Sequence, residues 1–153
     1  MLMNLLLGCA TVFVSMSIQV TVVVYMLRYL LKRMGREDRK TDGFSFDTYA
    51  ISMVLLILFS GHLVQIAIWA TLFIYLGEFN DFLTAFYHSA VNFASLGYGD
   101  IVMSEKWRLL GALEASNGVL MFGLSAGTLL AVMTNLFSRH KVTEAMRQNN
   151  AKD

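Results

Sequence analysis

Hydrophobic residues in this chain form three long uncharged stretches, and the charged residues are confined to the segments between and after them. No Asp, Glu, Lys or Arg occurs at positions 1–27, 48–77 or 115–138. A helix needs about 20 apolar residues to cross the hydrocarbon of a bilayer. Helices are expected rather than strands, because an isolated strand leaves its backbone hydrogen bonds unmade in lipid. The pattern therefore predicts transmembrane helices at residues 4–31, 48–76 and 109–137.

Composition supports a membrane protein and narrows its function. The 153 residues are 56% hydrophobic and 15% charged, whereas soluble domains carry about 25% charged residues. The formal net charge of +1 gives no reason to expect a nucleic-acid partner. A single cysteine, Cys9, excludes intrachain disulfides and a cysteine-based zinc site. Because no nucleophile–base pair, phosphate-binding loop or metal-ligand cluster is present, we do not expect an enzyme.

The basic residues predict the orientation in the membrane. Six of the twelve lie in the last turn of the first predicted helix or just after it: Arg28, Lys32, Arg33, Arg36, Arg39 and Lys40. Four more lie after the third: Arg139, Lys141, Arg147 and Lys152. By the positive-inside rule, the basic loop at 32–47 and the tail at 138–153 are cytoplasmic. The N-terminus and the connection 77–108 then face outward from the cell membrane, with Trp107 expected as an interfacial anchor.

The outer connection is too apolar for a solvent loop. Residues 82–94 are uncharged and would form a helix of about 20 Å, too short to cross the membrane. Asn80 or Asp81 is a candidate N-cap. This pattern is typical of a re-entrant helix, which enters and leaves the bilayer on the same side. The residues after it, Ser95-Leu96-Gly97-Tyr98-Gly99-Asp100, would be non-helical backbone at membrane depth.

The two glycines of that run indicate a role in binding cations. Glycine at alternate positions permits positive φ, so that successive carbonyls can face one axis. A ring of such carbonyls can replace the water shell of an alkali cation. The short helix would direct its C-terminal partial negative charge toward the membrane centre. Residues 77–108 carry four acidic and two basic side chains, and the excess of negative charge would concentrate cations.

Ser95–Asp100 resembles the potassium-channel signature Thr-Val-Gly-Tyr-Gly-Asp at four of six positions. Residues 48–137 as a whole resemble the two-transmembrane pore module of bacterial potassium channels, here preceded by one additional helix at 1–31. The resemblance implies an all-α fold with an outer helix at 48–76, a pore helix at 82–94, a filter at 95–100 and an inner helix at 109–137. It also implies a homotetramer in the lipid bilayer that carries K⁺ passively, with no cofactor and no substrate other than monovalent cations.

The resemblance assigns roles to the residues of the filter. K⁺ would be bound by the backbone carbonyls of Ser95, Leu96, Gly97 and Tyr98. The Ser95 hydroxyl would add the innermost ligand, and Gly99 would complete the outer turn below Asp100 at the mouth. The Tyr98 ring would point away from the pore into an aromatic belt that includes Tyr87.

Several positions depart from the family pattern. Ser95 and Leu96 replace threonine and valine, which leaves a weakly selective monovalent cation channel as an alternative. A non-conducting accessory subunit that retains the pore fold is a second alternative. Val91 stands where some bacterial members have a glutamate that bonds the filter aspartate. Asp100 therefore needs another partner, and we expect Tyr87 or His88.

Glu114 lies unusually within the third predicted helix, where an unpaired carboxylate is costly. Glu114 and Asn117 share one helix face, and Asn92 of the pore helix is an available partner. We predict that Glu114 braces the back of the filter. The alternative is a carboxylate that reaches the outer water.

The inner helix contains Gly118, Gly123 and Gly127, among other glycines, and by analogy with the family Gly118 is the expected hinge. Gly123 and Gly127 form a small-xxx-small motif, which favours close helix packing. A stripe at helical spacing could line an inner cavity, although packing in the core explains it equally well: Val119, Phe122, Ala126 and Leu130.

Two of the predicted spanning helices carry polar side chains at helical spacing. They are Thr11, Ser15 and Gln19 in the first, and His62, Gln65 and Trp69 in the second. We expect these polar faces to meet between the helices, because transmembrane interfaces use such hydrogen bonds.

Overall fold

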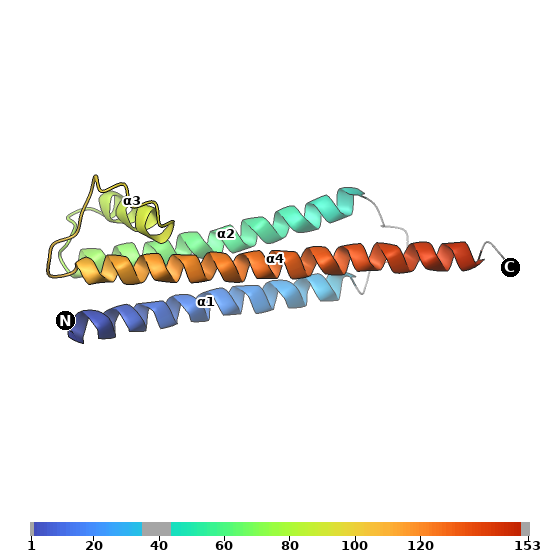
Figure 1. Cartoon of the computed structure of the whole chain (residues 1–153), viewed down its shortest axis with the longest axis horizontal. Helices are drawn as coiled ribbons and strands as arrows, with labels where there is room; N and C mark the ends of the chain where they lie inside the picture. The colour runs from blue at the N-terminus through green and yellow to red at the C-terminus, as the bar shows by residue number, and fades with distance from the viewer. Residues whose placement is uncertain (1, 35–43, 151–153) are drawn as a thin grey trace.

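The structure, a computed structural model, describes residues 2–34 and 44–150. Four helices make up these residues: α1 Leu2–Met34, α2 Phe44–Tyr75, α3 Phe82–Phe93 and α4 Arg108–Asn150. No strand occurs in this part of the chain. Helices α1, α2 and α4 run side by side along the long axis, and the short α3 lies at one end (Figure 1). The all-α class predicted from the sequence is confirmed.

Three of the helices are long and apolar enough to cross a membrane, as predicted. The candidate spans are Leu2–Leu30, Asp47–Tyr75 and Arg108–Ser138. Many large apolar side chains on these helices are exposed, among them Leu6, Phe13 and Leu56. A helix that is apolar on all sides matches a lipid environment, in which no polar outer face is needed. The chain is therefore a multi-pass membrane protein.

Helix α4 is longer than predicted, because it continues to Asn150 rather than ending at 137. The charged residues after Ser138 mark the end of the apolar span, but charge does not end a helix. The sequence contains no proline, and no glycine follows Gly127, so neither strong helix breaker is available there. Of the predicted cytoplasmic segments, Arg36, Arg39, Lys40 and Lys152 lie outside the described residues.

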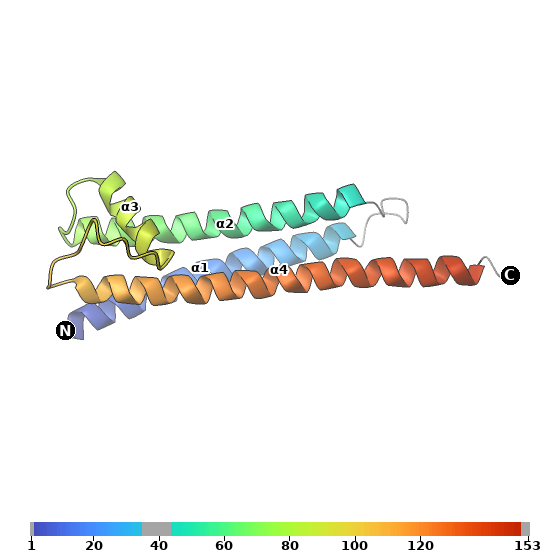
Figure 2. The ribbon, with the colours of Figure 1, turned by 45° about the horizontal axis from the view of Figure 1, so that its top comes forward.

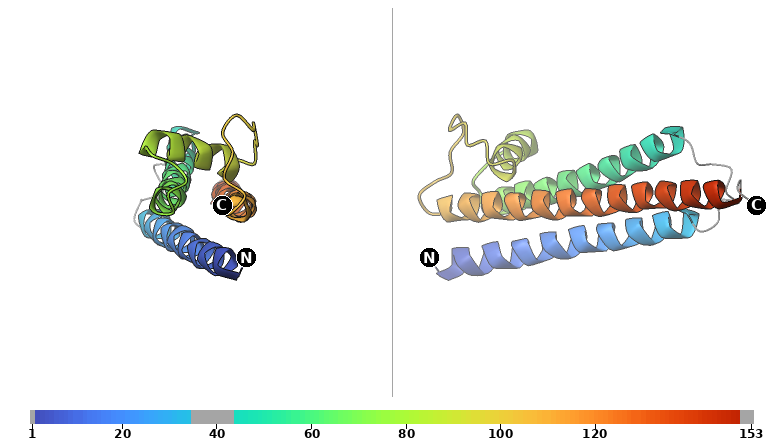
Figure 3. Two further views of the ribbon diagram at one scale, coloured as in Figure 1. Left: turned by 90° about the vertical axis from the view of Figure 1, so that its left-hand side faces the viewer. Right: turned by 45° about the vertical axis from the view of Figure 1, so that its right-hand side comes forward.

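Two apolar clusters hold the long helices together. The cluster nearer the C-terminal end of α1 joins three helices: Val23, Met26 and Leu30 of α1, Ala50, Val54 and Leu58 of α2, and Val132 and Leu136 of α4. The second joins α2, α3 and α4: Ile66, Trp69, Phe73, Phe93, Trp107, Leu110 and Met121. Helix α3 runs from the end of α2 toward α4 (Figure 2), and α1 packs on the other side of the α2–α4 pair (Figure 3).

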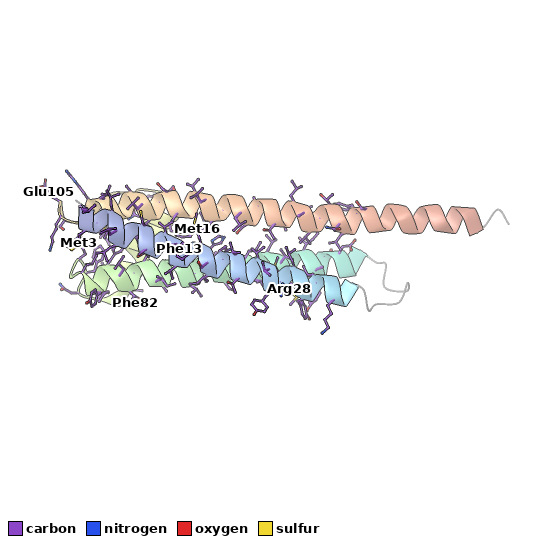
Figure 4. The ribbon with its side chains drawn as sticks, turned by 90° about the horizontal axis from the view of Figure 1, so that it is seen from below. Met3, Phe13, Met16, Arg28, Phe82 and Glu105 are labelled. Atoms are coloured by element: carbon purple, nitrogen blue, oxygen red, sulfur yellow. The ribbon has the colours of Figure 1, made fainter. Side chains whose placement is uncertain are left out.

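The start of α1 lies beside the connection between α3 and α4. The Asn4 side-chain amide donates a hydrogen bond of 2.5 Å to the carbonyl of Lys106. Met3 and Glu105 accordingly lie at one end of the molecule, and Arg28 lies near the opposite end of α1 (Figure 4). Trp107 is buried in the second cluster, so its side chain packs in the core of this chain and does not serve as the interfacial anchor predicted from the sequence.

Candidate functional site

The short helix α3 has a defined start and end. Asp81 is the N-cap, since its Oδ1 accepts a 2.9 Å hydrogen bond from the backbone N–H of Thr84. This bond to Thr84 holds the pKa of Asp81 below its usual value. The helix ends at Phe93, and the N–H of Ala94 still donates to the carbonyl of Ala90 at 3.0 Å. Residues 82–93 therefore form the short helix predicted between two spans, one residue shorter than expected.

The backbone after α3 alternates in handedness. The φ angles of Ser95, Gly97 and Gly99 are 57°, 57° and 74°. Nothing lies within 4 Å of a Cβ built on Gly97 or Gly99, so it is the positive φ that favours glycine at these two positions. Ser95 is the one non-glycine residue with positive φ in the described part of the chain. A backbone that is left-handed at every second residue can turn successive carbonyls to one side.

The whole run from Ser95 to Asp100 is exposed in the single chain. Leu96 retains 54% and Tyr98 65% of their accessible surface. Within the described residues no aromatic ring stacks on Tyr98. The predicted aromatic belt around Tyr98 is therefore not formed by this chain alone.

Asp100 has a partner from α3. The Tyr87 hydroxyl donates a 2.7 Å hydrogen bond to Oδ2 of Asp100, and the backbone N–H of Ile101 donates to Oδ1 at 3.0 Å. The bond with Tyr87 lowers the pKa of Asp100 and raises that of Tyr87. Of the two candidate partners for Asp100, the geometry selects Tyr87.

His88 makes a different connection between α3 and the segment after the filter run. Its Nδ1 lies 3.1 Å from the carbonyl of Ile101, and its Nε2 lies 2.8 Å from the side-chain amide nitrogen of Asn92. A neutral imidazole with its proton on Nδ1 satisfies both contacts, since Nε2 then accepts from Asn92. Burial lowers the pKa of His88 and favours this neutral form.

Behind α3, a group of buried polar side chains surrounds Glu114. Glu114 has no exposed surface and lies beside Ser89 and Asn92. Among the described residues, no hydrogen-bond partner is found for either Glu114 carboxyl oxygen, the Ser89 hydroxyl or the Asn117 amide. The structure thus places Glu114 against the pore helix, as the bracing hypothesis requires. Its full burial contradicts the alternative of a carboxylate reaching outer water.

Gly118 is a point of close approach between α4 and α3. A Cβ built on Gly118 would lie 1.9 Å from the carbonyl oxygen of Phe93. The absence of a side chain therefore allows the end of the pore helix to rest on α4. The hinge role predicted for Gly118 is a separate property that remains a prediction. Gly123 and Gly127 meet nothing within 4 Å, so the packing expected of them is not made within this chain.

The four residues predicted to line a cavity share an exposed face of α4. Val119, Phe122, Ala126 and Leu130 are all exposed in the single chain, so packing in this chain's own core does not explain the stripe. Phe122 also contacts α2 and α3. Its ring centroid lies 4.9 Å from that of His62 and 5.8 Å from that of Phe93.

Two features of the site were not predicted from the sequence. The carboxylate of Glu78 accepts hydrogen bonds from the backbone N–H and the hydroxyl of Ser104, at 2.8 and 2.5 Å. This pair ties the loop after α2 to the segment before α4. A cavity of about 460 Å³ also lies between α3, the filter run and α4, with His88, Gly99 and Arg108 among its lining residues. No periodic pattern indicates either feature, because both depend on how the loops fold back.

The site belongs to a membrane protein in which a short helix and a glycine-containing loop lie between two spanning helices. Residues 61–135 match the family model Ion_trans_2, which is described as an ion channel. The match begins within α2, includes α3 and the run 95–100, and ends within α4. It indicates that the protein is an ion channel. Comparisons with curated proteins and with solved structures gave no match.

Proposed function

We propose that the protein is a potassium-selective channel that conducts K⁺ passively through a filter formed by four copies of the chain. The observation that carries the proposal is the alternation of positive φ at Ser95, Gly97 and Gly99. It allows the carbonyls of Ser95, Leu96, Gly97 and Tyr98 to act as ligands for a dehydrated cation.

The electrostatics around the filter run favour a cation. Helix α3 begins at the N-cap Asp81, next to the end of α2, and its C-terminus leads directly into Ser95. The partial negative charge of a helix C-terminus therefore lies at the inner end of the proposed filter. Asp100 is held ionised by Tyr87 at the other end.

A closed ring of chains is needed because one chain presents the filter run on its surface. Ser95 to Asp100 are exposed, and one strand of carbonyls cannot replace a complete hydration shell. The exposed face of α4 that carries Phe122 and Leu130 would then turn toward the axis below the filter.

We also propose that the N-terminus and the connection 77–108 face the outside of the cell membrane. Support comes from the position of Arg28 at the end of α1 remote from Glu105 (Figure 4), together with the positive-inside rule. Labelling of a cysteine introduced at Glu105, in a Cys9→Ser background, by a membrane-impermeant maleimide added to intact cells tests this orientation. Labelling only after the cells are permeabilised would reverse it.

The function is tested by ion flux from liposomes that contain only the purified chain, under K⁺ and Na⁺ gradients in turn. We expect K⁺ flux with little Na⁺ flux, and loss of that flux in Gly99→Ala. The matched control is Gly77→Ala, because Gly77 also has positive φ, 75°, and open space around it, but lies outside the filter run. Both substitutions strain the backbone equally, so only a filter role makes Gly99→Ala the more damaging.

Two other outcomes identify the alternatives. Equal K⁺ and Na⁺ fluxes would indicate the weakly selective cation channel that Ser95 and Leu96 allow. No flux of either ion from a tetrameric preparation, across voltage, pH and lipid composition, would indicate an accessory subunit and overturn the proposal.

A further inference from the structure

A chain of hydrogen bonds, buried at Gln19 and Gln65 and part-buried at Ser125, links the additional helix α1 to both long helices of the pore region. The Gln65 side-chain amide donates to Oε1 of Gln19 at 2.8 Å, and the Gln19 amide donates to the Ser125 hydroxyl at 3.2 Å. The Ser125 hydroxyl also lies 3.0 Å from Nε2 of His62. A hydroxyl can accept from Gln19 and also bond His62, so the four side chains form one connected series of hydrogen bonds. Gln19 is its centre.

The series is built into the fold. Gln19 and Gln65 have no exposed surface, and His62 is 5% exposed. Gly61 provides the space, because a Cβ at Gly61 would lie 2.6 Å from Oε1 of Gln19. A buried polar group without a partner is costly in lipid. The arrangement therefore favours one relative position of α1, α2 and α4.

Ser125 is the residue of α4 that takes part in this series, and it lies on the far side of Gly118 from the filter run. Ser125 is seven residues beyond Gly118, about 10 Å along the helix. On the near side, a Cβ built on Gly8 of α1 would lie 2.3 Å from the Leu113 side chain of α4. Helix α1 thus contacts α4 both before and after the proposed hinge. Beyond Ser125, its contacts with Val132 and Leu136 are apolar.

We propose that Gln19 is a positioning residue that holds the inner helix straight across Gly118, so that α1 sets the balance between conducting and non-conducting states. The proposal rests on the proposed channel function. It gives the additional helix α1 a role in controlling the position of the inner helix α4. Apolar contacts between helices permit sliding, whereas the Gln19–Ser125 bond holds one position. Loss of one interhelical hydrogen bond in a membrane protein changes an equilibrium by about 3-fold on average.

The test compares two variants that break the series from different sides. Gln19→Leu removes both the donor and the acceptor, and Gly61→Ala displaces the Gln19 side chain without changing any hydrogen-bonding group. Ser17→Ala is the matched control on α1, because the Ser17 hydroxyl is exposed and bonds only the Phe13 carbonyl of its own helix. Each full-length protein is reconstituted in lipid. Single-channel open probability and amide hydrogen exchange of residues 126–137 are then measured.

We expect both variants to change the open probability at least about 3-fold in the same direction. We also expect faster amide exchange in residues 126–137, with Ser17→Ala unchanged in both measurements. Unchanged exchange and unchanged open probability in two properly assembled variants would overturn the proposal, and so would an equal effect of Ser17→Ala. A wild-type protein without flux would count against the channel function. The exchange measurement would still decide the role of Gln19.

Discussion

The Tyr87 hydroxyl and the Asp100 carboxylate are joined by a hydrogen bond of 2.7 Å across thirteen residues of sequence. The bond connects the pore helix α3 to the outer end of the filter run. It lies on the surface, where water competes for both groups. Its proposed importance is therefore geometric, because it fixes the direction of the Asp100 side chain while the Ile101 N–H holds the other carboxyl oxygen.

Tyr87→Phe removes this bond while keeping the ring. We expect a lower K⁺ flux and a smaller K⁺/Na⁺ flux ratio, because the outer end of the filter loses a tether to α3. The control is Tyr75→Phe, since Tyr75 is 87% exposed at the end of α2. The liposome flux assay measures both variants. A ratio equal to that of the wild type would show that Ile101 alone is sufficient to hold Asp100.

Outer pH is expected to act through His88. Burial places the pKa of His88 below its ordinary value of about 6.5, so the unfolded chain binds the proton more readily than the folded one. The stability contributed by neutral His88 is complete above about pH 6.5 and decreases as the pH falls below that value. The imidazolium form can no longer accept from Asn92.

We therefore expect acidification of the outer solution from about pH 7.5 to 5 to reduce K⁺ flux in the wild type and to affect His88→Gln less. Titration of Asp100 does not contribute to this pH dependence, because the hydrogen bond from Tyr87 lowers the pKa of Asp100 further below the pH range tested. Parallel pH profiles for the two proteins would exclude His88 as the titrating group.

Gly118→Ala should destabilise the fold in addition to any effect on gating. The new methyl group would meet the Phe93 carbonyl, and overpacking of this kind costs about 1–3 kcal/mol. Thermal unfolding in detergent measures the loss. Gly123→Ala is the matched substitution, because nothing of the chain lies within 4 Å of that position. A hinge without a packing role would instead give altered gating and an unchanged unfolding temperature.

Glu114→Gln tests whether the buried carboxyl behind α3 supports the filter. The side chain keeps its size but exchanges one oxygen for an amide beside Ser89 and Asn92. We expect the K⁺/Na⁺ flux ratio to fall, because the two sides of the new amide differ and one of the two carboxyl oxygens that face α3 is lost. Ser116→Ala is the control, since that hydroxyl is exposed and bonds only its own helix. Unchanged selectivity would leave Glu114 with a packing role alone.

The three spanning helices could be predicted from the sequence because the length of each charge-free stretch matches the thickness of a bilayer. The charge pattern places the end of the third span at 137, within one residue of Ser138, but it does not show that the helix continues to Asn150, since leaving the hydrocarbon and ending a helix depend on different residues. The meeting of Gln19 and Gln65 followed from helical periodicity on two faces. The burial of Trp107 did not, because it depends on how the loop before α4 turns inward.

Within the site, the sequence offers Tyr87 and His88 as partners for Asp100 but does not distinguish between them. Both lie on α3, and the choice depends on the rotation of that helix relative to residues 99–101. Similarly, the glycine at position 118 was recognised, but its contact with Phe93 requires knowing that two backbones come together there. Contacts between residues far apart in the sequence leave no local sequence pattern from which they can be predicted.

The unbroken length of α4 has a mechanical consequence. Its 43 residues form a rod of about 65 Å, and the part from Gly118 to Asn150 is about 48 Å long. A rotation of about 10° at Gly118 would move the backbone at Asn150 by about 8 Å, while residues near the filter would move by a small fraction of that distance. The helix is therefore a lever whose long arm lies away from the filter, and a modest force applied near Asn150 acts on Gly118 with a large moment.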